Sequence, residues 1–177
     1  MTLAAPMAEG ELRLEPLAEA HREPLRRACA KDPAIWTIYP MSFGGEHFDA
    51  SFDKCLRGDT VPFAILLGGE LVGMSSYLDV AAKHGSVQIG RTYFVPRVRG
   101  SGVNARVKRL MLSRAFASGF RRVEFKVDTR NGRSMAAIAK MGAVHEGVLR
   151  RNLVTWTGFV RDTAVYSILA DEWPVCG

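Results

Sequence analysis

The segment Arg97-Val98-Arg99-Gly100-Ser101-Gly102 has the residue types that bind a phosphate group. Two glycines allow a tight turn and leave the backbone amides unshielded, and the helix predicted to follow adds unpaired amides and a partial positive charge. Arg97 and Arg99 add full positive charges. We therefore expect this segment to bind a phosphate or pyrophosphate.

The segment differs from two common phosphate-binding loops. A Walker loop needs Gly-Lys-Ser/Thr after its first glycine and is excluded, because Ala105-Arg106-Val107 stands there instead. Gly100, Gly102 and Ala105 fit the dinucleotide pattern G-x-G-x-x-A, and Asp128 follows at the right distance. That fold needs further parallel strand-helix units, whereas the rest of the chain is predicted to form a short helix and a hairpin. The dinucleotide loop stays an alternative with weak support.

The spacing of apolar residues predicts the elements that hold this segment. Val87 to Val95 reads as a strand, which ends there because the next residue, proline, has no amide hydrogen for pairing. Val103, Val107 and Met111 recur at helical spacing after the glycines. The predicted strands are 11–15, 62–67, 71–78, 87–95, 122–127, 147–155 and 161–169, and the predicted helices are 17–30, 46–56, 102–118 and 131–141. This order predicts a mixed α/β domain.

The composition is that of one ordinary globular domain. The 177 residues are 47% hydrophobic and 24% charged, which excludes a disordered chain and a disulfide scaffold. No run approaches the ~18 to 20 apolar residues that span a bilayer, and the first ten residues lack the pattern of a secretory signal. Cys29, Cys55 and Cys176 are odd in number and lack zinc spacing, so we expect reduced thiols, no metal and a cytoplasmic protein. We expect a single domain over 1–177, with a core of about 11–174.

The positive charge is concentrated in one part of the chain. Residues 91–151 hold 15 Lys and Arg against three acidic residues, whereas the remaining residues carry a net negative charge. A basic half indicates a polyanionic ligand, either the phosphates of a cofactor or a nucleic acid. Solvated helix faces are the alternative explanation.

Beyond the glycine segment, further motifs follow in order. Together they resemble the GNAT acetyltransferases, and within them the RimJ/RimL-type branch that acetylates protein N-termini. The likeness covers most of residues 11–174 and is strong from Val87 onward. It rests on Gln88-Ile89-Gly90, the loop 97–104, Asn131-x-x-Ser134, Lys140-Met141-Gly142-Ala143, Glu146-Gly147-x-Leu149-Arg150 and Arg161-Asp162-x-x-x-Tyr166-Ser167.

The resemblance implies a GNAT fold, which is a central, mostly antiparallel sheet with splayed middle strands and flanking helices. It also implies acetyl-CoA as the cosubstrate. The strand ending at Phe94-Val95 is expected to separate from the strand 122–127 at Pro96, so that its free backbone pairs with the pantetheine arm. Asn131 would contact that arm or only cap a helix. Ser134, one turn into that helix, would contact the cofactor near its sulfur. The residues expected at the pyrophosphate are Arg97, Arg99, Gly100, Ser101, Gly102, Val103 and Asn104.

The expected reaction is direct transfer of the acetyl group to a primary amine. A backbone amide at Phe94 or Val95 is the candidate donor to the oxyanion, and Ser134 is the candidate proton donor to the departing thiolate. Glu146 and Asp128 are candidate bases, although each also fits a structural role. Residues 151–154 carry no acid where some RimL-like proteins have one.

The most favoured acceptor is a protein N-terminal α-amine. A small amine such as an amino acid, polyamine or drug is the alternative within the fold, and a non-catalytic acyl-CoA binding protein is the alternative outside it. Trp156 and the segment 36–39 are candidate walls of the acceptor pocket. Neither a membrane nor nucleic acid is required, and a homodimer is compatible with this interpretation.

Overall fold

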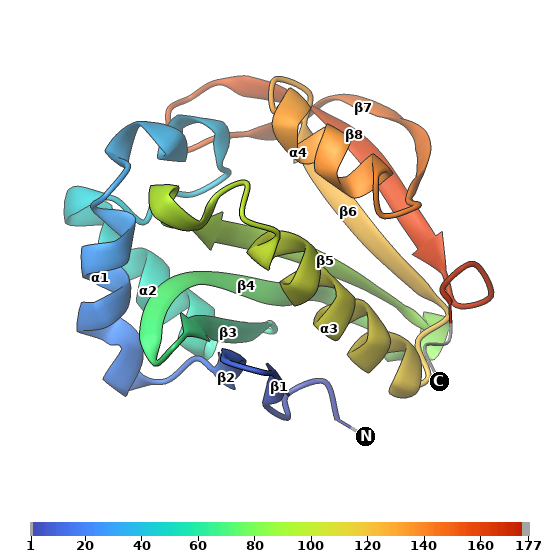
Figure 1. Cartoon of the computed structure of the whole chain (residues 1–177). Helices are drawn as coiled ribbons and strands as arrows, with labels where there is room; N and C mark the ends of the chain where they lie inside the picture. Colours follow the sequence, from blue (N-terminus) through green and yellow to red (C-terminus); the bar gives the residue numbers. More distant parts are fainter. Residues whose placement is uncertain (1, 175–177) are drawn as a thin grey trace.

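Within residues 2–174, which the computed structural model describes, eight strands form one sheet and four α-helices pack on it (Figure 1). The strand order is β1-β2-β3-β4-β5-β6-β8-β7. The strands are β1 Met7–Glu9, β2 Leu12–Pro16, β3 Val61–Leu67, β4 Glu70–Ala81, β5 Ser86–Phe94, β6 Arg122–Asp128, β7 Val144–Val154 and β8 Val160–Leu169. The helices are α1 Arg22–Cys29, α2 Phe48–Arg57, α3 Val103–Ala117 and α4 Gly132–Ala139.

Helices cover both faces of the sheet. Successive residues of a strand point to opposite faces. Thr92 of β5 contacts Lys108 of α3, whereas the hydroxyl of the next residue, Tyr93, donates to the carbonyl of Ala28 in α1. Helix α3 therefore lies on one face and α1 on the other, and Figure 1 shows α4 on the same side as α3.

The sheet opens in its middle, between β5 and β6. These are its two parallel neighbours, and all other neighbouring strands are antiparallel. They pair only from Ser86–Arg122 to Gln88–Glu124, and beyond that point they diverge in a V (Figure 1). The predicted splay of the middle strands is thus present, but it begins after Gln88 rather than at Pro96.

A bulge in β5 explains this early separation. The register between β4 and β5 shifts between Met74 and Ser76, and Arg91 has a φ of 49°, in the left-handed region. An extra residue on one strand bends that strand and increases its twist. The bulge therefore turns β5 away from β6 well before proline ends the strand.

The predicted mixed α/β architecture is confirmed, and the predicted elements are present with shifted ends. The largest shift is in the first helix, which begins at Arg22 rather than Leu17 because Glu19–His21 forms a 3-10 turn. Strand β1 is absent from the prediction. Between α1 and α2, Pro33–Ile38 forms a 3-10 helix, where the sequence showed only an aromatic, irregular stretch.

One cluster of buried apolar side chains runs through the described residues, from Leu3 to Ile168. Cys29 and Cys55 are buried in it and unpaired, whereas Cys176 lies outside the described residues. No helix in residues 2–174 is long and apolar enough to cross a membrane. Over the same residues, no group of three or more His, Cys, Asp and Glu side chains could hold a metal ion.

Candidate functional site

The open edge of β5 presents backbone groups to the gap. The carbonyl of Thr92 accepts a hydrogen bond of 2.6 Å from the Tyr39 hydroxyl, and the carbonyl of Phe94 accepts one of 2.8 Å from Nε of Arg99. The amide of Val95 instead donates to Val72 on β4, at 2.9 Å. Because backbone groups alternate between the two edges of a strand, the amide of Phe94 faces the gap. Of the two predicted oxyanion donors, Phe94 therefore remains, and the prediction for Val95 is wrong.

The glycine loop between β5 and α3 is open on the side where a ligand would lie. Gly100 and Gly102 have φ values of 81° and 87°, which side chains rarely adopt, and a Cβ at either position would meet no atom within 4 Å. Within the described residues, neither of their amides donates to another group of the chain. The first turn of α3, beginning at Val103 and Asn104, adds further amides without helical partners. This arrangement suits an anion, which would be bound mainly by backbone amides.

The two arginines of the loop already have carboxylate partners. Arg97 pairs with Glu70 at 2.7 Å, and both groups are exposed. The guanidinium of Arg99 binds Asp32 as well as the Phe94 carbonyl, and one of its nitrogens, Nη2, is buried without a partner. Their predicted contact with a phosphate stays a prediction, but their charges are partly neutralised.

Two other loop side chains differ in what they offer a ligand. The Ser101 hydroxyl donates to the Val98 carbonyl at 2.7 Å, so this side chain turns back toward the loop. The side-chain oxygen of Asn104 is buried and has no hydrogen-bond partner among the described residues. A buried unpaired acceptor is costly, and a donor on a bound ligand would satisfy it.

Asn131 begins helix α4 directly after β6. Its side chain accepts a hydrogen bond of 3.1 Å from the amide of Ser134, so its predicted role as a helix cap is confirmed. The Ser134 hydroxyl has no partner among the described residues and is partly exposed. The cofactor contacts of both residues stay predictions.

Asp128 closes β6, and its carboxylate is held by one neighbour. Burial works against its negative charge, but hydrogen bonds from the guanidinium and amide of Arg130 outweigh burial and hold the pKa of Asp128 below its usual value. A carboxylate in this state is a weak base. The structure therefore argues against Asp128 as the general base.

Glu146 lies at the closed end of the gap. Its carboxylate binds both terminal nitrogens of Arg122, the residue that pairs with Ser86 where β5 and β6 are joined. It also accepts a hydrogen bond from Ser167. These contacts, above all the one with Arg122, lower the pKa of Glu146 to about 2. Neither its position nor its basicity suits the predicted role as a base.

The segment 36–39 bridges the gap between β5 and β6. Tyr39 reaches Thr92 on β5, and the carbonyl of Thr37 accepts a hydrogen bond from Arg130, which follows β6. The indole nitrogen of Trp156, in the β7–β8 hairpin, donates to the carbonyl of Trp36 at 2.8 Å. The two predicted acceptor walls thus meet, although the Trp36 ring itself is buried in the core. Burial raises the pKa of the Tyr39 hydroxyl, which is therefore neutral near pH 7.

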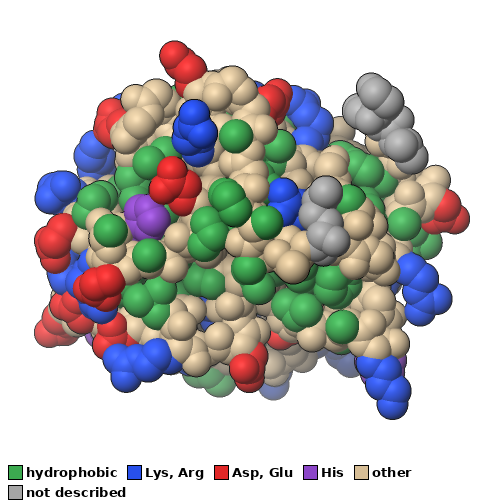
Figure 2. Space-filling view, turned by 90° about the horizontal axis from the view of Figure 1, so that it is seen from below, with side chains coloured by type: hydrophobic (Ala, Val, Ile, Leu, Met, Phe, Trp, Pro, Cys, Tyr) green, Lys and Arg blue, Asp and Glu red, His purple; other side chains and the backbone are tan. Residues whose placement is uncertain are grey.

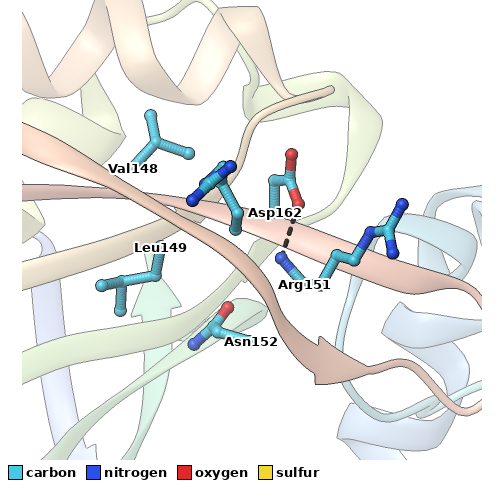
Figure 3. Close-up of a pocket in the computed structure, with 6 residues that line it drawn as sticks. Val148, Leu149, Arg151, Asn152 and Asp162 are labelled. Atoms are coloured by element: carbon cyan, nitrogen blue, oxygen red, sulfur yellow. Dashed lines mark hydrogen bonds between the residues drawn. The ribbon is translucent and has the colours of Figure 1, made fainter.

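An open cavity of about 900 Å³ lies along β7 (Figure 3). Pairing of β7 with β8 is interrupted between Leu149 and Leu153, and the Arg151 amide donates to Asp162 at 2.7 Å in this interruption. β8 also pairs with β6 at its Asp128 end, which is the end where the gap between β5 and β6 is wide. The cavity therefore lies toward that end of the sheet. Its lining residues are Val148, Leu149, Arg150, Arg151, Asn152 and Asp162.

The fold neutralises part of the basic half of the chain. Six of its Lys and Arg residues form ion pairs, several with acids from the other part of the chain. On the face seen in Figure 2, blue side chains are scattered among red and green ones rather than gathered in one patch. This distribution favours a local anion site over a nucleic-acid surface. The pairs are Arg97–Glu70, Arg99–Asp32, Arg106–Glu9, Arg122–Glu146, Lys126–Asp79 and Arg130–Asp128.

Together these features suit an elongated ligand that is anionic at one end. The loop before α3 offers amides to phosphates, the open edge of β5 offers pairing to an amide-containing arm, and the Phe94 amide offers a donor to a polarised carbonyl. Sequence reasoning identified these parts. It missed the Tyr39–Thr92 bond, because no local pattern links residues so far apart in the chain.

Comparisons with known proteins agree with this geometry. The family model described as acetyltransferase (GNAT) domain matches residues 11–144. A protein of T. thermophilus assigned as an acetyltransferase is 36% identical, with a TM-score of 0.87 and coverage of 96% of this chain and 91% of that chain. A GCN5-related N-acetyltransferase from Brucella melitensis is 27% identical, with a TM-score of 0.90 and coverage of 97% of this chain and 81% of that chain.

The RimJ/RimL-type branch is represented among the similar folds. The structure of RimL, the ribosomal L7/L12 alpha-N-protein acetyltransferase, is 19% identical, with a TM-score of 0.80 and coverage of 91% of each chain. At this identity the likeness shows a common fold, and the branch is not confirmed. The curated proteins gave no match to this chain.

Proposed function

We propose that this chain, which belongs to the GNAT acetyltransferases and is an acetyl-CoA-dependent N-acetyltransferase, acetylates protein N-terminal α-amines. The observation that carries the proposal is the open cavity along β7. It lies toward the end of the sheet where the gap between β5 and β6 is wide. An open groove with apolar and charged lining suits an extended chain terminus better than an enclosed pocket would.

The residues present fit acetyl-CoA. The amides of Gly100, Gly102, Val103 and Asn104 would hold its pyrophosphate, and the unpaired oxygen of Asn104 is available to a donor on the ligand. The open edge of β5 would align the pantetheine arm. When bound, acetyl-CoA supplies the thioester carbonyl that an amine attacks.

The chain contributes positioning and hydrogen-bond donors to the transfer. The Phe94 amide is aimed at the gap, where it would donate to the developing oxyanion. The Ser134 hydroxyl is the candidate to protonate the thiolate. Asp128 and Glu146 are both held by arginines, so the proposal includes no carboxylate base. An α-amino group titrates near pH 8, which leaves a useful neutral fraction at cellular pH without a strong base.

We further propose that the acetyl group passes directly between the two substrates. A covalent intermediate needs an activated nucleophile. Cys29 and Cys55 are buried, and burial raises the pKa of both thiols, most of all that of Cys29. The nucleophilic thiolate is therefore scarce at either position.

The test uses a panel of short peptides and small amines with acetyl-CoA. We expect acetylation of peptide α-amines, located by fragment mass spectrometry, with intersecting initial-rate lines and an enzyme of unchanged mass. The control peptides are the same sequences with a blocked N-terminus and a free internal lysine, which should not react. Faster turnover of amino acids or polyamines would favour the small-amine alternative. Ping-pong kinetics, or enzyme that gains one acetyl group from acetyl-CoA alone, would contradict direct transfer.

The contribution of Asn131 to cofactor binding can be separated from its cap. Asn131→Ala removes both the cap and the side-chain amide, whereas Asn131→Ser keeps a capping oxygen but loses the amide. We expect both variants to bind CoA about tenfold more weakly, because each loses a hydrogen bond to the pantetheine arm. Only Asn131→Ala should lose about 1 kcal/mol of stability. Calorimetry at a temperature where all three proteins are folded measures this; equal affinities would leave Asn131 as a cap alone.

A further inference from the structure

Helix α3 carries a buried lysine that the mechanism above does not use. Lys108 is 5% exposed. Its Nζ donates a hydrogen bond of 2.6 Å to the Thr92 hydroxyl and lies 5.5 Å from the centroid of the Phe125 ring. A buried amine of this kind is rare unless it is paired with a carboxylate, so its presence needs an explanation.

The two contacts of Lys108 place its amine at the apex of the gap. Thr92 is on β5 and Phe125 is on β6, directly after Glu124, the last residue of β6 that pairs with β5. The amine therefore lies on the α3 face of the sheet, where the strands begin to separate.

Thr92 belongs to the bulge that turns β5 away from β6. Its hydroxyl bonds Ser75 at 2.8 Å as well as Lys108, and its carbonyl accepts from Tyr39. It is held from both faces of the sheet, and the Phe94 amide follows two residues later on the same edge. A change at the Lys108 amine is therefore transmitted to the open edge through Thr92.

No described carboxylate lies within salt-bridge distance of Lys108, and burial lowers the pKa of its amine to about 7. Most other charged and titratable groups of α3 and of the strands packed on it are engaged elsewhere. Arg109 of α3 is exposed, Asp128 of β6 pairs with Arg130, and Glu70 of β4 pairs with Arg97. On β4, Asp79 pairs with Lys126 of β6, and Tyr77 donates to the Met111 carbonyl. On β6, Glu124 pairs with Arg122, and on β5, Arg91 contacts Thr60 and Cys55 while Tyr93 contacts Ala28. On α3, Arg106 pairs with Glu9, and Arg114 donates to the carbonyls of residues 2, 5 and 6.

We propose that Lys108 is a positioning residue that holds the β5 bulge at the apex of the gap and takes up a proton when coenzyme A occupies the loop at the start of α3. The inference rests on the proposed cofactor loop. The cofactor is then the missing partner of Lys108, because its phosphates supply the negative charge that the chain does not place near this amine.

The size of the effect follows from the helix. Lys108 is five residues after Val103, which is about 7.5 Å along the axis. Two phosphate charges roughly 10 Å away, at an effective dielectric constant of about 20, raise the pKa of an amine by about 2 units. An amine with a pKa of about 7 is mostly neutral at pH 7.5 before binding and mostly charged after it, which corresponds to an uptake of about 0.7 proton per CoA.

The experiment is calorimetry of CoA binding to the full chain in buffers with different ionisation enthalpies at pH 7.5. The dependence of the observed heat on buffer gives the number of protons taken up. We expect Lys108→Met to take up about 0.7 proton fewer than the wild type, whereas Lys83→Met, at an exposed position, should match the wild type. Subtracting the proton uptake of Lys108→Met from that of the wild type removes the contribution of the cofactor's own phosphates.

A second variant keeps the amine but removes its acceptor. Thr92→Val should make the charged amine harder to form, so the pH at which uptake is greatest should fall by about 1 unit. This result is also decisive if Lys108→Met fails to fold. Equal uptake in the wild type and Lys108→Met, or an unshifted profile in Thr92→Val, would overturn the inference while leaving the cofactor loop intact. Absence of CoA binding in the wild type would instead contradict the proposed loop.

Discussion

Gly102→Glu is expected to lower the affinity for CoA at least about 100-fold, which corresponds to about 2.7 kcal/mol. Gly102 immediately precedes α3, and in the unliganded chain a Cβ there would meet nothing within 4 Å. The open space is where the pyrophosphate would lie. A glutamate side chain would occupy it and place a negative charge within a few Å of the phosphates, which costs on the order of 3 kcal/mol at an effective dielectric constant of about 20.

The positive φ of Gly102 makes a matched control necessary. Any side chain at a φ of 87° is strained, so a loss of affinity in Gly102→Glu alone could reflect a distorted loop. Gly102→Gln has the same size and the same strain but no charge. Calorimetry with CoA, together with thermal unfolding by circular dichroism, should show a smaller loss for Gln than for Glu in two folded proteins. A folded Gly102→Glu protein that binds CoA normally would contradict the loop assignment.

Lys108→Met is expected to flatten the dependence of stability on pH. Burial holds the pKa of the folded amine at about 7, whereas an unfolded lysine keeps its proton to about pH 10. Between these values the unfolded chain binds more protons, so this site makes the free energy of unfolding rise with pH from about 7 to 10. The rise attributable to the site is on the order of a few kcal/mol. Methionine removes it and should make the protein more stable at pH 7.

Urea unfolding of the cofactor-free protein at pH 7, 8.5 and 10 measures this difference. Thr92 keeps its bond to Ser75 in Lys108→Met, so the loss of one hydrogen bond does not leave its hydroxyl unpaired. Lys83→Met is the control, because it replaces a lysine at an exposed position by the same residue. Parallel pH profiles for the wild type and Lys108→Met would mean that the buried amine keeps an ordinary pKa.

The sequence by itself determined most of the elements and the candidate anion-binding loop. The local signals are the glycines at 100 and 102, a strand before them and apolar residues at helical spacing after them. Such signals can be recognised without knowledge of the fold. The cap at Asn131 belongs to the same class, because its partner is three residues away. The ordered set of motifs was enough to indicate the family, which the comparisons then showed.

Only the tertiary structure decided which site residues are free to act. Asp128 and Glu146 looked equivalent as candidate bases, but Arg130 and Arg122 hold them, and Glu146 sits at the closed end of the gap. The start of the gap depends on the bulge at Arg91, which appears only when β5 is paired with β4. Lys108 looked like one more positive charge on a helix. Its burial depends on Thr92 and Phe125, two residues of separate strands, so no pattern along the chain could reveal an amine without a counter-charge. Arg122 is 24 residues from Glu146, and Thr92 is 16 residues from Lys108, so only the fold brings these partners together and sets the basicity of both groups.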